Sequence, residues 1–311
     1  MVENSMPADL GLVSVIMPAW NAEDTIADSI QSALSQSYTN IRLIVIDDCS
    51  TDGTVDVVQA FSSRDDRVQL IQLETNQRAA MARNHGIIER PSESRWLAFL
   101  DSDDVWHPDK IRLQLEHASS TNAGLVYSSY WRMSSDMSLY GRPVRVPKAI
   151  SYQQLLSNTA IAASTVLMDL EKIPKVQLVK GMHEDFELWT RLLSSGVVAT
   201  GVQKPLMCYR LRKDSVSSNS VRMSRHTWRI IKGQPNLSFA RACSCYFRYA
   251  VRAFFKHARC APRFPLGTRP DSDPALFLGS LLRPNLSDPS VDRGHLVQGE
   301  DSQVAVGSTH E

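Results

Sequence analysis

Short apolar runs alternate with longer amphipathic stretches through the first hundred residues of the chain. Four runs have the length and composition of buried strands: 13–18, 43–47, 68–73 and 96–100. The stretches between them carry apolar positions at helical spacing: 22–36, 54–61 and 79–89. Strands and helices in this rhythm favour an α/β fold, with a mostly parallel sheet flanked by helices.

Beyond residue 120 the alternation loosens. We predict further strands at 125–131, 165–168 and 206–211, a short helix at 152–156, and a helix at 186–193 that Gly196 ends. Between Arg222 and Arg263 there are ten Lys or Arg residues and no acid. From residue 262 onward Pro, Gly, Ser and Asp dominate, which is typical of disorder. We therefore divide the chain into four parts: an N-terminal tail at 1–11, an α/β domain at 12–221, a basic amphipathic helical segment at 222–263 and a disordered tail at 264–311.

Composition changes this picture little. The chain has 311 residues and is 43% hydrophobic, which suits one large domain with an appendage. Its formal charge of +1 points to no particular partner. No apolar run approaches the roughly 20 residues of a membrane span, and residues 1–11 lack the pattern of a signal peptide. Five cysteines without paired zinc-ligand spacing favour free thiols in a reducing cytoplasm.

Polar clusters follow three of the predicted strands, at 18–21, 47–52 and 101–104. The carboxyl ends of parallel strands meet at one edge of a sheet, and ligands bind there. In the last cluster Asp101, Asp103 and Asp104 would repel one another by about 4 kcal/mol per pair at about 4 Å. A hard divalent cation, Mn²⁺ or Mg²⁺, would relieve that repulsion. A solvated turn with an Asp as helix cap is the other interpretation.

Five segments in order resemble the motifs of inverting family 2 glycosyltransferases with the GT-A fold: 13–21, 45–54, Asn76 with 82–86, 99–104 and 183–189. The resemblance covers 13–218. It implies an enzyme that moves one sugar from a nucleotide-sugar, with a UDP-sugar favoured, to an acceptor hydroxyl with inversion.

The same resemblance implies roles for individual residues. The donor would be bound by Pro18, Ala19, Asn21, Asp48, Arg83, Asp101 and Ser102. Asp48 would accept an N–H of the base, and Arg83 would face the phosphates. Asp103 would be the principal metal ligand, supported by Asp101, and Asp185 would be the general base. The alternatives are a turn before a helix for Asp48, a solvated helix residue for Arg83, and an acid in a first helical turn for Asp185.

Some positions depart from the family pattern. Trp20 stands where Tyr or Phe is usual, which keeps a stacking surface, and Arg78 stands where glycine is usual. The Q-x-x-R-W signature of processive synthases is missing, and this favours addition of a single sugar over polymerisation.

Two further questions stay open at this stage. The segment 222–263 favours either peripheral contact with an anionic membrane, at its cytoplasmic face, or packing on the domain, and it carries no nucleic-acid recognition motif. The acceptor would be a glycan or a lipid-linked sugar in surface polysaccharide or glycolipid synthesis. The competing functions are a sugar nucleotidyltransferase, whose Gly-rich loop after the first strand is lacking here, and a degenerate nucleotide-sugar-binding protein without activity.

Overall fold

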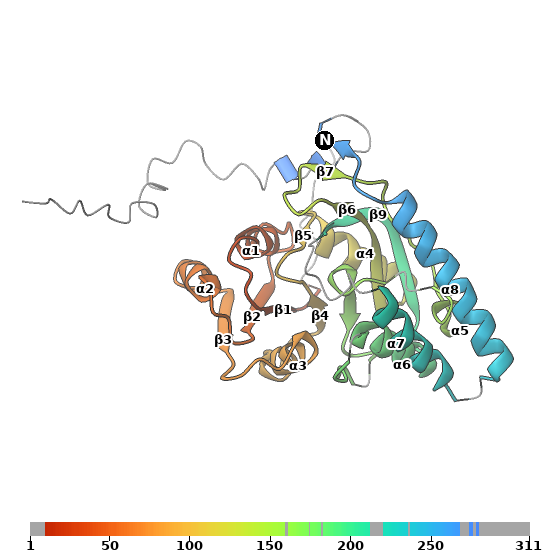
Figure 1. The fold of residues 1–311 in the computed structure, drawn as a ribbon. Coiled ribbons are helices and arrows are strands. Elements are labelled where there is room, and N and C mark those ends of the chain that lie inside the picture. The colour runs from red at the N-terminus through yellow and green to blue at the C-terminus, as the bar shows by residue number, and fades with distance from the viewer. Residues whose placement is uncertain are drawn as a thin grey trace, which may run out of the picture.

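The protein is described by a computed structural model that covers residues 10–158, 161–173, 175–181, 183–211, 220–235, 237–267, 274–275 and 278–279. These residues form a central sheet with helices on both faces (Figure 1). The strands are β1 (Val13–Ala19), β2 (Ile41–Asp47), β3 (Val68–Gln72), β4 (Trp96–Phe99), β5 (Val105–Trp106), β6 (Leu125–Met133), β7 (Leu139–Tyr140), β8 (Leu167–Asp169), β9 (Ala199–Arg210) and β10 (Phe264–Pro265). The helices are α1 (Ile26–Leu34), α2 (Thr54–Ser62), α3 (Ala79–Glu89), α4 (Lys110–Thr121), α5 (Tyr152–Leu155), η1 (Ala163–Thr165), α6 (Glu184–Ser194), α7 (Ser220–Lys232) and α8 (Phe239–Arg259).

The sheet has the strand order β10-β7-β6-β8-β4-β1-β2-β3, and β9 lies along β6 and also pairs with β5. The strands β4, β1, β2 and β3 are parallel. Their carboxyl ends therefore meet at one edge, as the sequence predicts. Beyond β4 the sheet is mixed: β8 runs antiparallel to both β4 and β6, while β9 is parallel to β6. Among these strands β6 and β7 are also antiparallel and are joined by a short turn.

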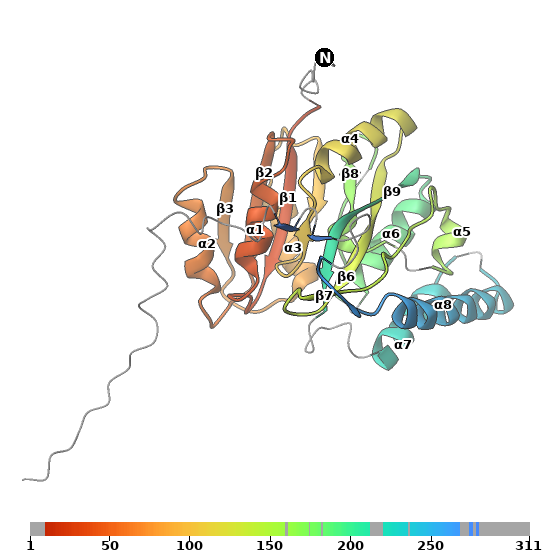
Figure 2. The same ribbon diagram turned by 90° about the horizontal axis from the view of Figure 1, so that it is seen from above.

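Side chains of β1 alternate between two hydrophobic cores. Val13, Val15 and Met17 join the core beneath α1, α2 and α4. Ile16 points to the opposite face, where α3 and α6 complete the second core. This period of two follows from the pleat of a strand buried on both faces. The strands of the sheet thus lie between two layers of helices (Figure 2).

The predicted α/β class is confirmed, and so are the predicted strands and helices of the first hundred residues, within a few residues at their ends. The last predicted strand, 206–211, is the end of the longer β9. The prediction of a disordered tail from residue 264 is wrong at its start. Phe264–Pro265 pairs with β7, and Phe264 packs on Tyr140 with ring centroids 5.9 Å apart. An aromatic and a proline suit this short edge pairing, which composition alone does not reveal. Most of the tail lies outside the described residues.

The basic segment contains two helices, α7 and α8 (Figure 1). They pack against each other through Trp228 and Tyr246, whose ring centroids are 5.3 Å apart. Ala242 of α8 and Ile231 of α7 are buried in the second core. Among the described helices, none is long and apolar enough to cross a membrane.

Candidate functional site

The turns after β1 and β2 are tied together by hydrogen bonds at the carboxyl edge. Asn21 has a positive φ of 46°, which Asn tolerates better than most residues. Its N–H donates to Ser50 Oγ at 3.0 Å, and its Oδ1 accepts from the Thr51 N–H at 2.9 Å. Pro18 and Ala19 form the end of β1, and the Ala19 carbonyl accepts the Asp48 N–H at 2.8 Å. The predicted donor residues of the first two motifs therefore lie side by side.

Asp48 is buried, and its carboxylate holds the loop before α3. Its two oxygens accept the N–H groups of Gln77 and Arg78, each at 2.7 Å. Each carboxylate oxygen has a second lone pair, so the residue retains acceptor capacity for a base N–H. Asp48 is therefore more than a residue of the turn before α2. Its carboxylate also ties that turn to the loop before α3.

Arg78 adopts a backbone conformation that normally requires glycine. Its φ is 73° and its ψ is 161°, directly before the first residue of α3. The loop thus keeps the glycine-like geometry although the residue carries a long side chain. A non-glycine residue in this region costs about 1–3 kcal/mol. The hydrogen bond from its N–H to Asp48 helps to hold the strained conformation.

The acid cluster after β4 divides into exposed and buried members. Asp101 and Asp103 are partly exposed, whereas Asp104 is buried and accepts the Arg210 N–H at 3.3 Å. Ser102 is anchored through its carbonyl, which accepts from Thr25 Oγ1 at 2.9 Å. Burial, reinforced by the charges of Asp103 and Asp101, holds the pKa of Asp104 well above its ordinary range. Asp104 is therefore a structural residue, and Asp101 and Asp103 are the ones that face solvent.

Arg210, at the end of β9, holds this loop in place through hydrogen bonds. Its Nε donates to the Asp103 carbonyl at 3.0 Å and its Nη1 to the Ser135 carbonyl at 3.3 Å. Its Nη2 pairs with Asp28 of α1 at 3.0 Å. No local sequence pattern singles out this arginine. Its partners come from three distant parts of the chain, so only the fold reveals its position.

Arg83 lies at the centre of the site. It is buried on α3, donates to Asp101 through Nη2, and donates to Glu184 through Nη1 at 3.2 Å. Burial lowers the pKa of the guanidinium, but Asp101 and Glu184 outweigh that effect and the net shift is upward. The interpretation of Arg83 as a solvated helix residue is therefore wrong. It bridges the acid loop after β4 to the first turn of α6.

Asp185 sits beside Glu184 in the first turn of α6. Its Oδ1 accepts the N–H of Phe186 at 2.7 Å. Burial raises the pKa of Asp185, and the Phe186 N–H and Arg83 only partly oppose this. Burial likewise raises the pKa of Glu184. A carboxyl group with a raised pKa is a stronger base, which suits proton abstraction from a hydroxyl.

Contacts of Trp189 and His183 hold the N-terminal part of α6 against the rest of the domain. Trp189 is fully buried against Phe99 of β4, with ring centroids 6.4 Å apart. His183 lies within 2.8 Å of the Thr227 hydroxyl of α7 through its Nδ1. Its ring also packs near Phe186. Sequence reasoning missed Thr227, which offers no local signal.

The exposed acids fit a divalent cation that shares its ligands with a phosphate. Within the described residues no group of three or more His, Cys, Asp or Glu side chains is arranged to hold a metal. Asp101 and Asp103 alone would supply an incomplete shell. Mg²⁺ and similar ions commonly take one or two carboxylates and complete their shell with substrate phosphates and water. The donor set is therefore suited to a metal that binds together with a diphosphate.

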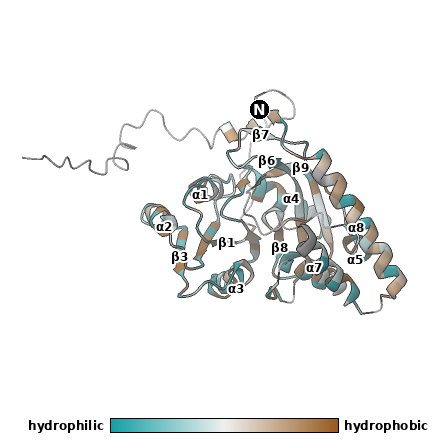
Figure 3. Ribbon diagram, in the orientation of Figure 1, coloured by the Kyte–Doolittle hydropathy of each residue, from teal (hydrophilic) through white to brown (hydrophobic). Residues whose placement is uncertain are grey.

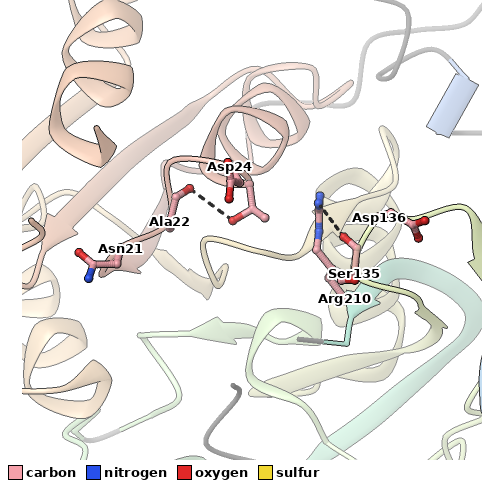
Figure 4. Close-up of a pocket in the computed structure, with 7 residues that line it drawn as sticks. Asn21, Ala22, Asp24, Ser135, Asp136 and Arg210 are labelled. Carbon is pink, nitrogen blue, oxygen red and sulfur yellow. Dashed lines mark hydrogen bonds between the residues drawn. The ribbon is translucent and has the colours of Figure 1, made fainter. Parts of the chain in front are cut away.

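A cavity of about 310 Å³ lies between the start of α1 and the end of β9 (Figure 4). It is lined by Asn21, Ala22, Asp24, Thr25, Ser135, Asp136 and Arg210. Of the predicted site residues only Asn21 lines it. The cavity thus lies next to the turn after β1, where the donor residue Asn21 is found. Glu184 and Asp185 of α6 do not line it.

The chain is similar to several known proteins. Residues 14–168 match the family described as Glycosyl transferase family 2. The chain is also 37% identical over 246 residues to TuaG of Bacillus subtilis (strain 168), across 79% of this chain and 97% of the relative. The chain belongs to glycosyltransferase family 2. The sugar nucleotidyltransferase alternative is therefore wrong.

Other relatives and solved structures extend this assignment. The Escherichia coli glucosyltransferase WfaP, named for a UDP-Glc donor and an α-D-GlcNAc-diphosphoundecaprenol acceptor, is 33% identical over 79% of this chain and 95% of its own length. The S. aureus TarS structure with UDP-GlcNAc has a TM-score of 0.61 at 17% identity, and the match covers 78% of this chain and 73% of that one. At that identity it shows a shared GT-A fold only. The glycosyltransferase thus has the fold that its sequence predicts.

Proposed function

We propose that this glycosyltransferase transfers one sugar from a UDP-sugar to a hydroxyl of a lipid-linked or glycan acceptor, with inversion, during synthesis of a surface polysaccharide or glycolipid. The name of TuaG assigns it to teichuronic acid biosynthesis, and that of WfaP specifies a UDP-sugar and a diphosphoundecaprenol-linked acceptor. The observation that carries the proposal is the position of Arg83. It joins Asp101, at the donor edge, to Glu184, directly before Asp185.

The donor would lie over the turns after β1 and β2. Asp48 would accept an N–H of the base, with Pro18, Ala19 and Asn21 beneath the ribose. Trp20 is 55% exposed beside them and offers a ring for stacking. Ser102 would contact the donor, and Asp101 would act through the metal, the ribose or water, with Arg83 behind them as a fixed positive charge.

Asp103 would ligate Mn²⁺ or Mg²⁺, supported by Asp101. When bound, such a cation neutralises the charge that develops on the leaving diphosphate. Arg83 already pairs with Asp101, so it limits the net negative charge of the edge. Arg210 keeps the Asp103 backbone in place from the opposite side.

Asp185 would remove the proton from the acceptor hydroxyl as that oxygen attacks the anomeric carbon. A single displacement of this kind inverts the anomeric configuration and needs no covalent enzyme intermediate. The raised pKa of Asp185 strengthens it as a base. Its hydrogen bond to the Phe186 N–H fixes the carboxylate, so that one oxygen stays available.

The enzyme would act at the cytoplasmic face of the cell membrane, where it would meet a lipid-linked acceptor. The basic segment 222–263 supports this placement through its ten Lys or Arg residues and lack of acids.

Calorimetric titration with UDP, GDP, dTDP and CMP, each with Mn²⁺ or with EDTA, tests the donor assignment. We expect UDP to bind selectively and only with Mn²⁺. Asp103→Asn should lose the metal-dependent part of that affinity, whereas Asp66→Asn, at an exposed position far from the edge, should keep it. Binding of none of the four nucleotides would contradict the proposal. Tight binding without sugar transfer would favour the degenerate binding protein.

A further inference from the structure

One side of α8 exposes large apolar side chains along most of its length. The exposed fractions are 66% for Phe239, 69% for Phe247, 38% for Val251, 69% for Phe254 and 47% for Phe255. Large apolar groups are usually exposed singly on soluble domains, and a contiguous set marks an interaction surface. Figure 1 shows α8 at the outer side of the molecule, and Figure 3 shows apolar and polar residues mixed along it.

The spacing of these residues gathers them into a stripe. Phe247, Val251, Phe254 and Phe255 are separated by four, three and one positions, which places them on one helical face. Exposed arginines form a second stripe beside it: Arg241, Arg248 and Arg259. Arg252 lies in the same stripe, but its Nη1 donates to the Ser157 carbonyl at 3.0 Å. The opposite side of the helix packs inward through Ala242 and Tyr249. We call the two stripes together the outer face of α8.

The charge of this face limits the partners that it fits. No acid occurs between Arg222 and Arg263, and α7 adds the exposed Arg225, Arg229 and Lys232 nearby. Two such faces would repel each other, which disfavours a second copy of this chain. A duplex nucleic acid would satisfy the arginines but leave the phenylalanines in water, and the segment carries no recognition motif for a single strand. A surface that is both anionic and apolar satisfies both stripes.

We propose that the outer face of α8 docks on a bilayer surface that contains anionic lipid, with the helix axis in the plane of the interface. The phenylalanines would enter the boundary between headgroups and acyl chains, and the arginines would contact lipid phosphates. The proposal specifies which surface of the enzyme would contact the membrane. It rests on the proposed function only for the reason why the enzyme would need to be there, namely its lipid-linked acceptor. Docking itself does not depend on catalysis.

The docked helix would also orient the catalytic edge. α7 packs on α8 through Trp228 and Tyr246, and its Thr227 contacts His183 at 2.8 Å. His183 directly precedes Glu184 and Asp185. A short chain of contacts therefore links the membrane-facing helix to the base.

Co-sedimentation of the full chain with lipid vesicles tests the proposal. The probes are vesicles of phosphatidylcholine alone and of phosphatidylcholine mixed with phosphatidylglycerol. We expect binding to the mixed vesicles only. The triple variant F247S/F254S/F255S should lose about a hundredfold in partition coefficient. The double variant R241Q/R248Q should lose about thirtyfold at low salt.

Matched controls are Ile88→Ser, which removes an apolar side chain that is 74% exposed on α3, and Arg64→Gln, which removes an exposed charge after α2. Both should bind vesicles as the parent does. Equal binding of the triple variant and its control would overturn the proposal, as would absence of binding to mixed vesicles. Loss of a dimer in light scattering by the triple variant, without lipid binding, would assign the face to a second copy instead. Unchanged UDP affinity of these variants separates a failure of docking from a failure of the donor site.

Discussion

The carboxyl edge of the sheet and the outer face of α8 use their side chains in opposite ways. At the edge, Asp48, Arg83 and Asp104 are buried and hydrogen-bonded to groups of the same chain. On α8, Phe247 and Phe254 are each 69% exposed. Side chains that must hold a small ligand in one geometry are held in place by hydrogen bonds to other residues of the protein. Side chains that contact a large and fluid surface, such as a bilayer, remain exposed to solvent in the free protein.

This contrast predicts where substitutions act. A change at the edge should alter chemistry or unfolding, because its residues support one another. A change on α8 should alter vesicle binding and leave the free energy of unfolding within about 0.5 kcal/mol. The following variants test the edge, from the largest expected effect to the smallest.

Asp185→Asn should lower the rate of sugar transfer by about 10²–10⁴-fold, because the amide cannot take up the acceptor proton. Nucleotide affinity should stay unchanged. In the parent enzyme kcat should rise with pH through a pKa above the ordinary value of 3.8, since burial favours the protonated carboxyl and only the ionised form is a base. Glu187→Gln on the same helix is the control. Near-normal transfer by Asp185→Asn would place the base elsewhere.

Arg83→Gln should lower the free energy of unfolding by about 3–5 kcal/mol at neutral pH, because it leaves Asp101 and Glu184 without their shared cation. The pKa values of Glu184 and Asp185 should rise further, since Arg83 now lowers both. A carboxyl group whose pKa is raised by folding destabilises the fold as it ionises. The loss should therefore shrink as pH falls through those pKa values, and the acid limb of the kcat profile should move to higher pH.

Denaturant titrations at neutral and acidic pH measure this effect. Arg112→Gln removes a partly exposed arginine that pairs with Glu116 at 2.8 Å, and it should cost no more than about 1 kcal/mol. A loss for Arg83→Gln that is equally small, or that does not change with pH, would show that the bridge contributes little.

Arg78→Gly should raise the free energy of unfolding by about 1 kcal/mol, because relief of a φ of 73° outweighs the added freedom of the unfolded chain. Ala79→Gly, at the first residue of α3, should instead lower it by up to about 0.5 kcal/mol. Thermal or denaturant unfolding of the pair gives the comparison. If the two glycines behave alike, the loop is not strained at Arg78.

The sequence carries the parts of the fold that depend on local pattern. Strand and helix periodicity predicts β1 to β4 and the helices between them, and the position of acids after strands predicts the edge. The antiparallel half of the sheet escaped prediction, because strand direction depends on how distant segments meet. The same holds for the contact of His183 with Thr227. Arg83 illustrates the limit: its motif was visible, but its two carboxylate partners are 18 and 101 residues away.

The clasp made by Arg210 has a consequence for the order in which the site is assembled. Its guanidinium joins Asp28, which is 182 residues earlier, to the Asp103 carbonyl, 107 residues earlier. During synthesis the N-terminal strands leave the ribosome first, yet the loop that bears Asp103 lacks this support until β9 has emerged and paired. The nascent enzyme would thus acquire a sheet before it acquires a finished donor edge. A growing chain would remain inactive until nearly all of its α/β domain (12–221) has been translated.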